Sequence, residues 1–454
     1  MKKLTLVLTD LVAFYGSLAL VLLVRYGPDR WDAAYDVHVG PFSILFLVWL
    51  FSFYIANLYE ERVLRAGSDF YGRLIQAVVV AAAISVAFFY LIPYFVIAPK
   101  LNLFLFIVVF AFVWAGARTL ANQSLAAGSK KRILMIGATK GVVDVARFVA
   151  LNPQLGWSVN AVARLGQDEL PLADASGPWD VLDDRTDLVG AIHQRHIDTV
   201  VIAPHAFVRE DLVAMLYRSI MHGVDFQSLA GFTESVTGTV PLDAIDQQWF
   251  LQNFAEGSKR SYEPLKRAVD VVAATMLGIP ALILTPFIAL AVKLSSPGPV
   301  LFRQERSGRG SVPFTMLKFR TMRADAERGT GAVWAKPKDP RVTRVGRFLR
   351  ATRLDELPQL WNVIRGDMSM VGPRAERPEL DTTLAAQIPF YHDRYLTRPG
   401  LSGWAQINYP YGGSVQDATR KLEYDLYYLK RRSFALDLEI ILKTVSIALR
   451  REGR

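Results

Sequence analysis

The chain has 454 residues, 52% of them hydrophobic, with a mean hydropathy of +0.22 and a formal net charge of +10. This apolar content exceeds that of an ordinary soluble protein, so the composition indicates a membrane protein with several domains. The absence of cysteine from the sequence excludes disulfides, thiol nucleophiles and cysteine-ligated zinc sites. The positive charge suits anionic lipid headgroups and phosphorylated substrates, whereas no motif supports nucleic-acid binding.

Four apolar segments near the start predict transmembrane helices, each close to the roughly 20 residues that a span requires. The first resembles a signal sequence, but no small-residue cleavage site follows it, so we interpret it as an uncleaved span. Asp10 within it is costly in lipid and is expected to be paired or to lie near the interface. We therefore predict a four-helix transmembrane domain over residues 1–120, with spans at 4–24, 41–59, 74–96 and 102–117.

The charges of the connecting segments predict the orientation of these helices. Acidic residues Asp29, Asp32 and Asp36 follow the first span, whereas basic residues gather at the alternate ends of the spans. Because basic segments stay in the cytoplasm, we expect the N-terminus and everything after residue 120 to be cytoplasmic. The basic residues are Lys2, Lys3, Arg62, Arg65, Arg73, Arg118, Lys130, Lys131 and Arg132.

Residues 128–230 show the pattern of a parallel, Rossmann-like α/β domain. Arg132–Ile136 predicts a buried strand, Val142–Leu151 a helix, and the segments Val159–Ala163 and Thr199–Ala203 further strands. The first turn departs from the dinucleotide fingerprint, because Thr139 and Val142 stand where glycines are needed for close approach of a pyrophosphate. We therefore expect a structural or regulatory domain. Residues 231–262 are interpreted as a connector.

A fifth apolar segment, Ala268–Val292, is long enough to cross a membrane but contains Pro280 and Pro286. Proline removes a backbone donor and clashes with the preceding turn, so a broken or kinked helix is expected, with the break at either proline. A complete fifth crossing would place the later residues outside the cell. We therefore predict a helix over 266–293 that enters the membrane and returns; a proline-kinked span is the alternative.

Asp355 and Glu356 are adjacent carboxylates flanked by arginines. Such a pattern suits phosphoryl transfer, in which carboxylates hold a divalent cation and guanidinium groups bind phosphate oxygens. The alternative is a structural helix that Thr352 caps and whose buried stripe is Leu357, Leu360, Trp361 and Ile364. The arginines that could bind phosphate are Arg350, Arg353, Arg365 and Arg374.

Arginines also recur at every third position from Arg341 to Arg353. This spacing equally suits an amphipathic helix at the membrane surface, with Val345, Phe348 and Leu349 directed inward. We expect Arg341 and Arg344 to contact lipid headgroups. Arg350 and Arg353 are expected to face substrate.

From Lys266 to the C-terminus the chain resembles the catalytic domain of bacterial polyprenyl-phosphate sugar-1-phosphate transferases, the monotopic phosphoglycosyl transferases. Their sequence blocks occur here in the same order, and the four spans with a Rossmann-like domain resemble the long form of the family. One block departs: the family breaks its membrane helix at a Ser-Pro pair, where this chain has Leu282-Ile283. The matching blocks are Lys266–Asp270, Ser296–Val300, Lys318–Met322, Leu354–Leu360, Gly366–Ser369, Val371–Arg374 and Arg398–Trp404.

The resemblance implies that residues 263–454 form a mostly helical catalytic domain at the cytoplasmic face of the bacterial inner membrane. It implies transfer of a sugar 1-phosphate from a UDP-sugar to undecaprenyl phosphate, the first membrane step of exopolysaccharide, capsule or O-antigen synthesis. Asp355 would be the nucleophile, with Mg²⁺ held by Asp355 and Glu356. Substrate phosphates would be bound by Lys318, Arg320, Arg350, Arg353 and Arg374.

Two other classes of function remain open at this point. A membrane-bound nucleotide-sugar dehydratase or epimerase would need an intact glycine fingerprint and a Tyr-x-x-x-Lys pair, for which Tyr262 and Lys266 have the spacing. A non-enzymatic assembly scaffold is the other. The sequence leaves open the transferred sugar and the choice between monomer and homodimer.

Overall fold

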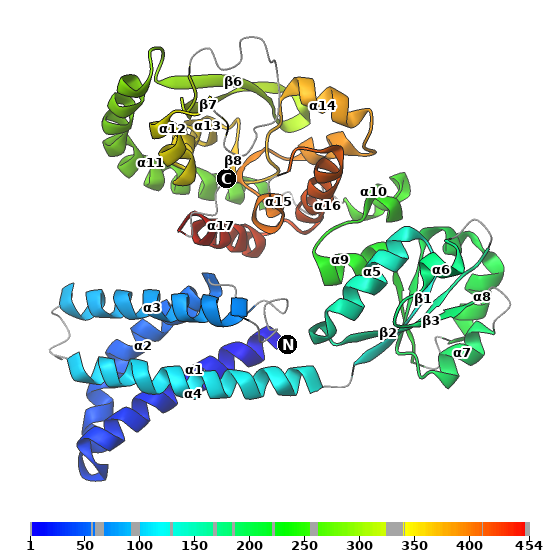
Figure 1. Ribbon diagram of the computed structural model, residues 1–454, viewed down its shortest axis with the longest axis horizontal. Coiled ribbons are helices and arrows are strands. Elements are labelled where there is room, and N and C mark those ends of the chain that lie inside the picture. Colours follow the sequence, from blue (N-terminus) through cyan, green and yellow to red (C-terminus); the bar gives the residue numbers. More distant parts are fainter. Residues whose placement is uncertain are drawn as a thin grey trace. The chain divides into compact units, whose positions relative to one another are not determined.

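The computed structural model divides into two compact units, Met1–Gln227 and Ser228–Arg454 (Figure 1). Each unit has its own hydrophobic clusters and is described separately. The described residues are 2–55, 58–59, 68–91, 100–127, 130–166, 170–183, 187–219, 223–254, 262–323, 339, 341–410 and 412–449.

Four long helices at the start of the first unit confirm the predicted membrane domain. They are α1 (Lys2–Tyr26), α2 (Trp31–Ile55), α3 (Ser68–Leu91) and α4 (Lys100–Ala127), with a short η1 (Pro28–Arg30) before α2. Residues 56–57 and 92–96 of the predicted spans lie outside the described residues. Large aromatic side chains fill the interior, among them Phe14, Phe46, Trp49 and Phe110. Aromatic packing of this kind stabilises helix contacts where lipid supplies no hydrophobic drive.

The buried Asp10 is paired, as its cost in lipid requires. The Arg118 guanidinium donates to both Asp10 oxygens, at 2.9 Å from Nε and 2.7 Å from Nη2. Tyr59 Oη and Trp114 Nε1 also donate to this carboxylate, at 2.6 and 2.7 Å. A charge with this many partners has its hydrogen-bonding needs met, so the cluster holds α1 against α4.

The rest of the first unit is a five-stranded sheet in the order β3-β2-β1-β4-β5. Strands β1 (Lys131–Ile136), β2 (Trp157–Ala163) and β4 (Thr199–Ile202) lie close to the predicted strands, and β1 pairs in parallel with both neighbours. Helices α7 and α8 pack on one face, and Figure 1 shows α5 on the other. The remaining elements are β3 (Asp180–Leu182), β5 (Asp225–Ser228), α5 (Lys140–Leu151), η3 (Pro153–Leu155), α6 (Leu172–Ala175), α7 (Leu188–Gln194), η4 (Pro204–Val208) and α8 (Glu210–Ser219).

The strand order reverses between β1 and β4, where a doubly wound sheet ordinarily binds its nucleotide. There Gly137 adopts a positive φ of 95°, and a Cβ on it would lie 2.7 Å from the His205 ring and 2.8 Å from Ala203. The imidazole therefore occupies the space next to the glycine that a pyrophosphate would approach. This packing supports the expectation of a structural or regulatory domain.

The second unit begins at Ser228, three residues before the segment that the sequence predicts to be a connector, and includes that segment. Helix α9 (Leu229–Thr237) is tied to α16 (Val415–Arg431) by an ion pair of 2.6 Å between Glu234 and Lys430. Val240 and Leu242 belong to a hydrophobic cluster with Leu422 and other residues of the C-terminal part. The described part of residues 231–262 is therefore built into the core of the second unit. Two more elements lie in it: η6 (Leu242–Ala244) and α10 (Gln247–Asn253).

The remainder of the second unit is mostly helical around short strands, as predicted. A long helix, α11 (Tyr262–Ser295), is followed by the antiparallel hairpin of β6 (Leu301–Ser307) and β7 (Pro313–Phe319). The later elements are η8 (Arg309–Ser311), α12 (Arg344–Ala351), η9 (Leu354–Glu356), α13 (Gln359–Arg365), β8 (Ser369–Val371), α14 (Pro378–Ala385), η10 (Tyr391–Leu396), β9 (Gly400–Ser402), α15 (Trp404–Asn408) and α17 (Phe434–Leu449).

Helix α11 runs without interruption through Pro280 and Pro286, so of the two expected forms, broken or kinked, the structure shows no break at either proline. Figure 1 shows instead that its axis bends between its two ends. A proline inside a helix commonly bends it in this way. Around the prolines, Leu282, Ile283 and Phe287 are exposed, which suits contact with lipid.

Candidate functional site

The acidic pair is positioned by a sharp reversal between α12 and α13. Thr343 caps α12 by accepting a hydrogen bond from Gly346 N at 2.9 Å. A Cβ on Gly346 would lie 2.0 Å from the carbonyl oxygen of Thr321, so only glycine lets the helix approach the chain after β7. Arg353 then takes a left-handed conformation, with φ of 58°, and turns the chain into η9. Non-glycine residues pay a small strain energy there, which is characteristic of functional sites.

Three basic side chains converge on the carboxylate of Glu356. Lys318 Nζ, from β7, lies 3.1 Å from Oε1, Arg374 Nη2 lies 3.7 Å from the same oxygen, and Arg353 Nη1 lies 3.6 Å from Oε2. Burial raises the pKa of Glu356, but the charges of Lys318, Arg374 and Arg353 outweigh it and lower the pKa to about 2. Glu356 is therefore ionised at neutral pH and engaged with cations.

Asp355 has a different environment, although it is the next residue. It is 7% exposed, and its carboxylate accepts no hydrogen bond from the described residues. Burial and the negative charge of Glu356 raise its pKa to about 6, against the opposing charges of Lys318, Arg350 and Arg353. Its carboxylate oxygens are therefore less engaged than those of Glu356, which are shared with three basic side chains.

The structure places the predicted phosphate-binding residues in two groups. Lys318, Arg353 and Arg374 surround the acidic pair as described above. Arg350 donates from Nε to Thr321 Oγ1 at 2.9 Å and is close enough to lower the pKa of Asp355. Arg320 is buried and donates to the carbonyl oxygens of Pro297 and Ser296, at 3.0 and 2.6 Å. It therefore fixes the segment after α11.

The alternative interpretation, a helix that begins at Thr352, is wrong. Thr352 ends α12, and its hydroxyl donates back to Phe348 O at 2.9 Å. Trp361 does not belong to a buried stripe either, because it is 58% exposed, whereas Leu360 and Val363 are buried. The acidic pair lies between α12 and α13 and is not part of the first turn of either helix.

Helix α12 is amphipathic, but two of its apolar residues face the protein. Leu349 is buried and Val345 packs beside it against Ile288 and Val292 of α11, so these two of the three residues predicted to be directed inward face the protein. Phe348 remains 60% exposed. Arg341, expected at lipid headgroups, forms an ion pair of 2.6 Å with Asp339.

Asn362 and Thr321 were not singled out from the sequence, yet both organise the site. Asn362 Nδ2 donates to Thr315 O at 2.8 Å and its Oδ1 accepts from Leu317 N at 3.1 Å, which fixes α13 against β7. An asparagine inside an otherwise apolar helical stripe is a signal that could have identified it. Thr321, which anchors Arg350, has no such signal.

Both ends of α11 are bonded to the same compact unit. Near its start, Asp270 accepts from Ser369 Oγ at 2.7 Å and from Met370 N at 3.1 Å. Its last turns pack on Phe319 through Val292, and the following Ser296 carbonyl is held by Arg320.

Tyr262 and Lys266 have the spacing of a dehydratase catalytic pair, but their contacts are structural. Tyr262 Oη and Lys266 Nζ both donate to Asp437 Oδ2, at 2.6 and 2.9 Å. Tyr428 Oη donates to the other oxygen of this carboxylate at 2.9 Å. The pair thus anchors α11 to α17, and its spacing does not indicate dehydratase chemistry.

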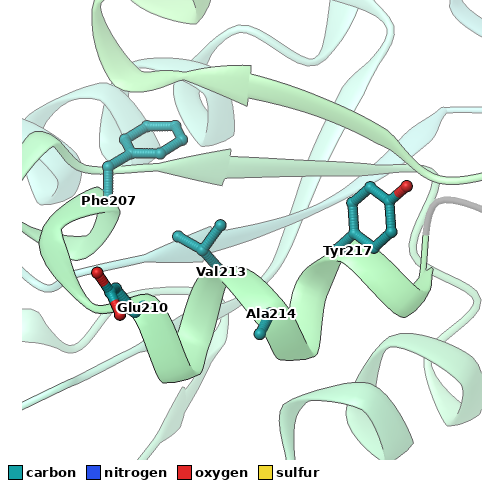
Figure 2. A pocket seen from close by; sticks show the side chains of 5 residues that line it. All are labelled: Phe207, Glu210, Val213, Ala214 and Tyr217. Atoms are coloured by element: carbon teal, nitrogen blue, oxygen red, sulfur yellow. The ribbon is translucent and has the colours of Figure 1, made fainter.

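The first unit contains a surface hollow of about 500 Å³ on η4 and α8. Figure 2 shows its lining, which includes Phe207, Val213 and Tyr217. Glu210 is the one charged side chain among the lining residues. The hollow has no cluster of titratable groups and so carries no chemistry. Among the described residues, no cluster of three or more histidine, aspartate or glutamate side chains is arranged to bind a metal ion by itself.

Comparison with known proteins identifies the second unit. The family described as bacterial sugar transferase matches residues 261–451. The UDP-N-acetylgalactosamine-undecaprenyl-phosphate N-acetylgalactosaminephosphotransferase of Aeromonas hydrophila is 38% identical over 279 residues, 60% of this chain and 62% of that protein. The UDP-glucose:undecaprenyl-phosphate glucose-1-phosphate transferase of Caulobacter vibrioides is 50% identical over 185 residues, 40% of this chain and 68% of that protein.

A third relative is covered almost completely. The exopolysaccharide production protein PSS of Rhizobium leguminosarum is 40% identical over 195 residues, which are 41% of this chain and 96% of that protein. The match to the Aeromonas protein leaves more than a third of that relative uncovered. The family match includes the acidic pair and the basic residues around it. The chain is therefore a membrane protein that belongs to the bacterial sugar transferase family.

Proposed function

We propose that this protein transfers a hexose 1-phosphate from a UDP-sugar to undecaprenyl phosphate through a covalent intermediate on Asp355. The observation that carries the proposal is the difference between two adjacent carboxylates. Glu356 is held by three cations, whereas the carboxylate of Asp355 is buried beside them without a hydrogen bond from the described residues. The printed names of the relatives support the donor and acceptor classes.

In the first step an Asp355 carboxylate oxygen attacks the β-phosphorus of the UDP-sugar. The bond from that phosphorus to the bridging oxygen breaks, and UMP leaves with the electron pair. Lys318, Arg353 and Arg374 carry three positive charges against the negative charges of Glu356 and the attacking Asp355. The remaining positive charge attracts the diphosphate and stabilises the leaving group. A phosphate oxygen of the lipid then attacks the adduct and restores the Asp355 carboxylate.

A magnesium ion fits this site as a companion of the nucleotide. Mg²⁺ is usually bound by one or two carboxylates together with substrate phosphates and water, and does not need a cage of protein ligands. Asp355 and Glu356 would supply the carboxylates, with Glu356 already shared with Lys318. When bound, the ion would shield the diphosphate charge.

The reaction is tested with purified full-length protein, magnesium, labelled UDP-sugars and undecaprenyl phosphate. We expect label in the lipid fraction together with release of UMP. Without the lipid acceptor, intact-mass measurement should show the protein plus one sugar phosphate. A keto-sugar product would favour a dehydratase, and no reaction across the donor panel would favour a scaffold. The same panel identifies the sugar.

The rate of adduct formation is expected to rise as the pH increases from 5 to 7. The attacking species is the carboxylate, and a pKa of about 6 leaves about 10% of Asp355 ionised at pH 5 and about 90% at pH 7. Because the negative charge of Glu356 contributes to this raised pKa, Glu356→Gln should shift the rise of the adduct-formation rate to lower pH. Single-turnover rates of adduct formation between pH 4.5 and 8 test the rise in the wild type and its shift in Glu356→Gln. A rate that does not change over this interval would contradict the assignment.

We propose further that the second unit faces the cytoplasm and that α11 enters the inner leaflet and returns. The bend in α11, its exposed apolar side chains around Pro286, and the bonding of both its ends to one unit support this arrangement. It also gives the site access to a lipid phosphate at the membrane surface and to cytoplasmic nucleotides. Asp29 in η1, together with Asp32 and Asp36 near the start of α2, suits the opposite side of the membrane.

Cysteine labelling tests this topology in a chain that has no cysteine of its own. Ser296 Oγ is buried, so the exposed Pro299 is the better position after α11. We expect Pro299→Cys to react with a membrane-impermeant maleimide only after the cells are opened. Asp29→Cys, in the exposed η1 segment, is the matched control and should react in intact cells. Reaction of Pro299→Cys in intact cells would show that α11 crosses completely.

A further inference from the structure

Three buried polar side chains lie along the turn that carries the proposed nucleophile. Asp355 is 7% exposed, Gln359 3% and Asn362 1%. The backbone from Leu354 to Arg365 is right-handed and helical, with short i to i+3 turns at Leu357 and Pro358. Gln359 therefore lies about one turn after Asp355, and both η9 and α13 pack against β7.

The roles of the two amides differ. Asn362 is fully bonded to the backbone of β7 and to Asp367, at 3.2 Å, which accounts for its burial. Gln359 Nε2 is buried, but none of the described residues accepts a hydrogen bond from it. An unbonded buried donor costs free energy, so such a group in a folded protein calls for an explanation. The nearest turn of the chain holds a carboxylate that also lacks a hydrogen bond from the described residues.

We propose that Gln359 is a positioning residue for the nucleophile: in the complex with the nucleotide sugar, Nε2 donates a hydrogen bond to the Asp355 oxygen that does not attack phosphorus. This inference rests on the proposed function of Asp355. Hydrogen bonds at catalytic groups are often incomplete until substrate binds, which fits the unbonded state of both partners. The donated bond directs the second oxygen toward the phosphorus and stays on the carbonyl oxygen of the resulting acyl phosphate.

Glutamine suits this position for a reason of charge. A lysine or arginine there would pair with Asp355 directly and compete for the oxygen that must attack. A neutral amide orients one oxygen and leaves the other available. The excess positive charge of Lys318, Arg353 and Arg374 then remains directed at the diphosphate.

The test compares Gln359→Met, which keeps the side-chain length and removes the donor, with wild type in the full-length protein. The probes are UDP-glucose and UDP-N-acetylgalactosamine without lipid acceptor. We expect the adduct-formation rate at saturating donor to fall about 10-fold to 100-fold, with KM for the donor changed less than about twofold. Gln359→Glu keeps the size, replaces the donor by a like charge and should be slower still. Gln387→Met, at an exposed glutamine of the same unit, is the matched control.

The split between rate and KM separates this role from a structural one. If the Gln359 amide were merely structural, its loss would lower the melting temperature and the active fraction. The folded fraction would still react at the wild-type rate. Wild-type adduct rates in the folded fractions of both Gln359 variants would overturn the inference about Gln359 and leave the proposed function in place. A wild-type protein that forms no adduct with any donor would overturn the proposed function, and this inference with it.

Discussion

Asp355→Asn is expected to abolish the covalent adduct and to lower transferase turnover by roughly 10³-fold or more. The asparagine amide keeps the shape of the side chain but is a poor nucleophile, and the described residues around Asp355 offer no substitute, because Glu356 is engaged with Lys318, Arg353 and Arg374. Removing a partly protonated buried carboxylate should leave membrane insertion intact. Intact-mass measurement and lipid-product formation check the two effects.

The matched control removes a carboxylate elsewhere in the same unit. Asp243 is exposed in η6, and Asp243→Asn should retain wild-type turnover. Near-normal turnover by Asp355→Asn would instead mean that the lipid phosphate attacks the UDP-sugar directly, without a covalent intermediate. That outcome would contradict any essential role of the Asp355 carboxylate in the reaction, as nucleophile or as base.

Glu356→Gln is expected to have the second largest effect, on both activity and stability. Glu356 is the shared partner of three cations, and its loss leaves the largely enclosed Lys318 beside two arginines with only Asp355 as a negative neighbour. Breaking a buried ion pair by removing one partner costs about 3 kcal/mol or more, so the melting temperature should fall. Misplaced cations should slow adduct formation by about 10²-fold.

The two effects can be separated by measurement. Thermal unfolding in detergent reports stability, and single-turnover adduct formation in the folded fraction reports catalysis. Glu379→Gln, at an exposed position of α14, is the matched control and should change neither. An unchanged adduct rate in Glu356→Gln would contradict the role of Glu356 in arranging the cations. It would leave the nucleophile assignment in place.

The sequence by itself was sufficient for the elements with strong local signals. The membrane helices follow from apolar runs of sufficient length, because lipid requires every backbone group to be bonded within the segment. The strands β1, β2 and β4 follow from short apolar runs that only burial on both faces explains. The site was located because adjacent carboxylates among arginines suit phosphate chemistry and because the sequence blocks around them resemble those of a known family.

Local rules failed where distant contacts decide the conformation. The prolines predicted a broken or kinked helix without distinguishing the two, and only the structure shows that α11 continues through Pro280 and Pro286 and bends. Thr352 has the residue type of an N-cap, but Gly346 packing on Thr321 and the left-handed Arg353 make it the end of α12. The segment predicted as a connector has no strong hydrophobic periodicity of its own. Its described residues form part of the hydrophobic core of the second unit because they pack against α16.

The family, the membrane location and the positions of the acidic pair were therefore determined by the sequence, since each rests on residue type and spacing along the chain. Only the tertiary structure distinguished Asp355 from Glu356, which are neighbours of the same charge. Their difference comes from Lys318 on β7 and Arg374 after β8, which lie 38 and 18 residues away along the chain and close to Glu356 in space. Electrostatic environments are set by such contacts through space, and linear spacing does not encode them.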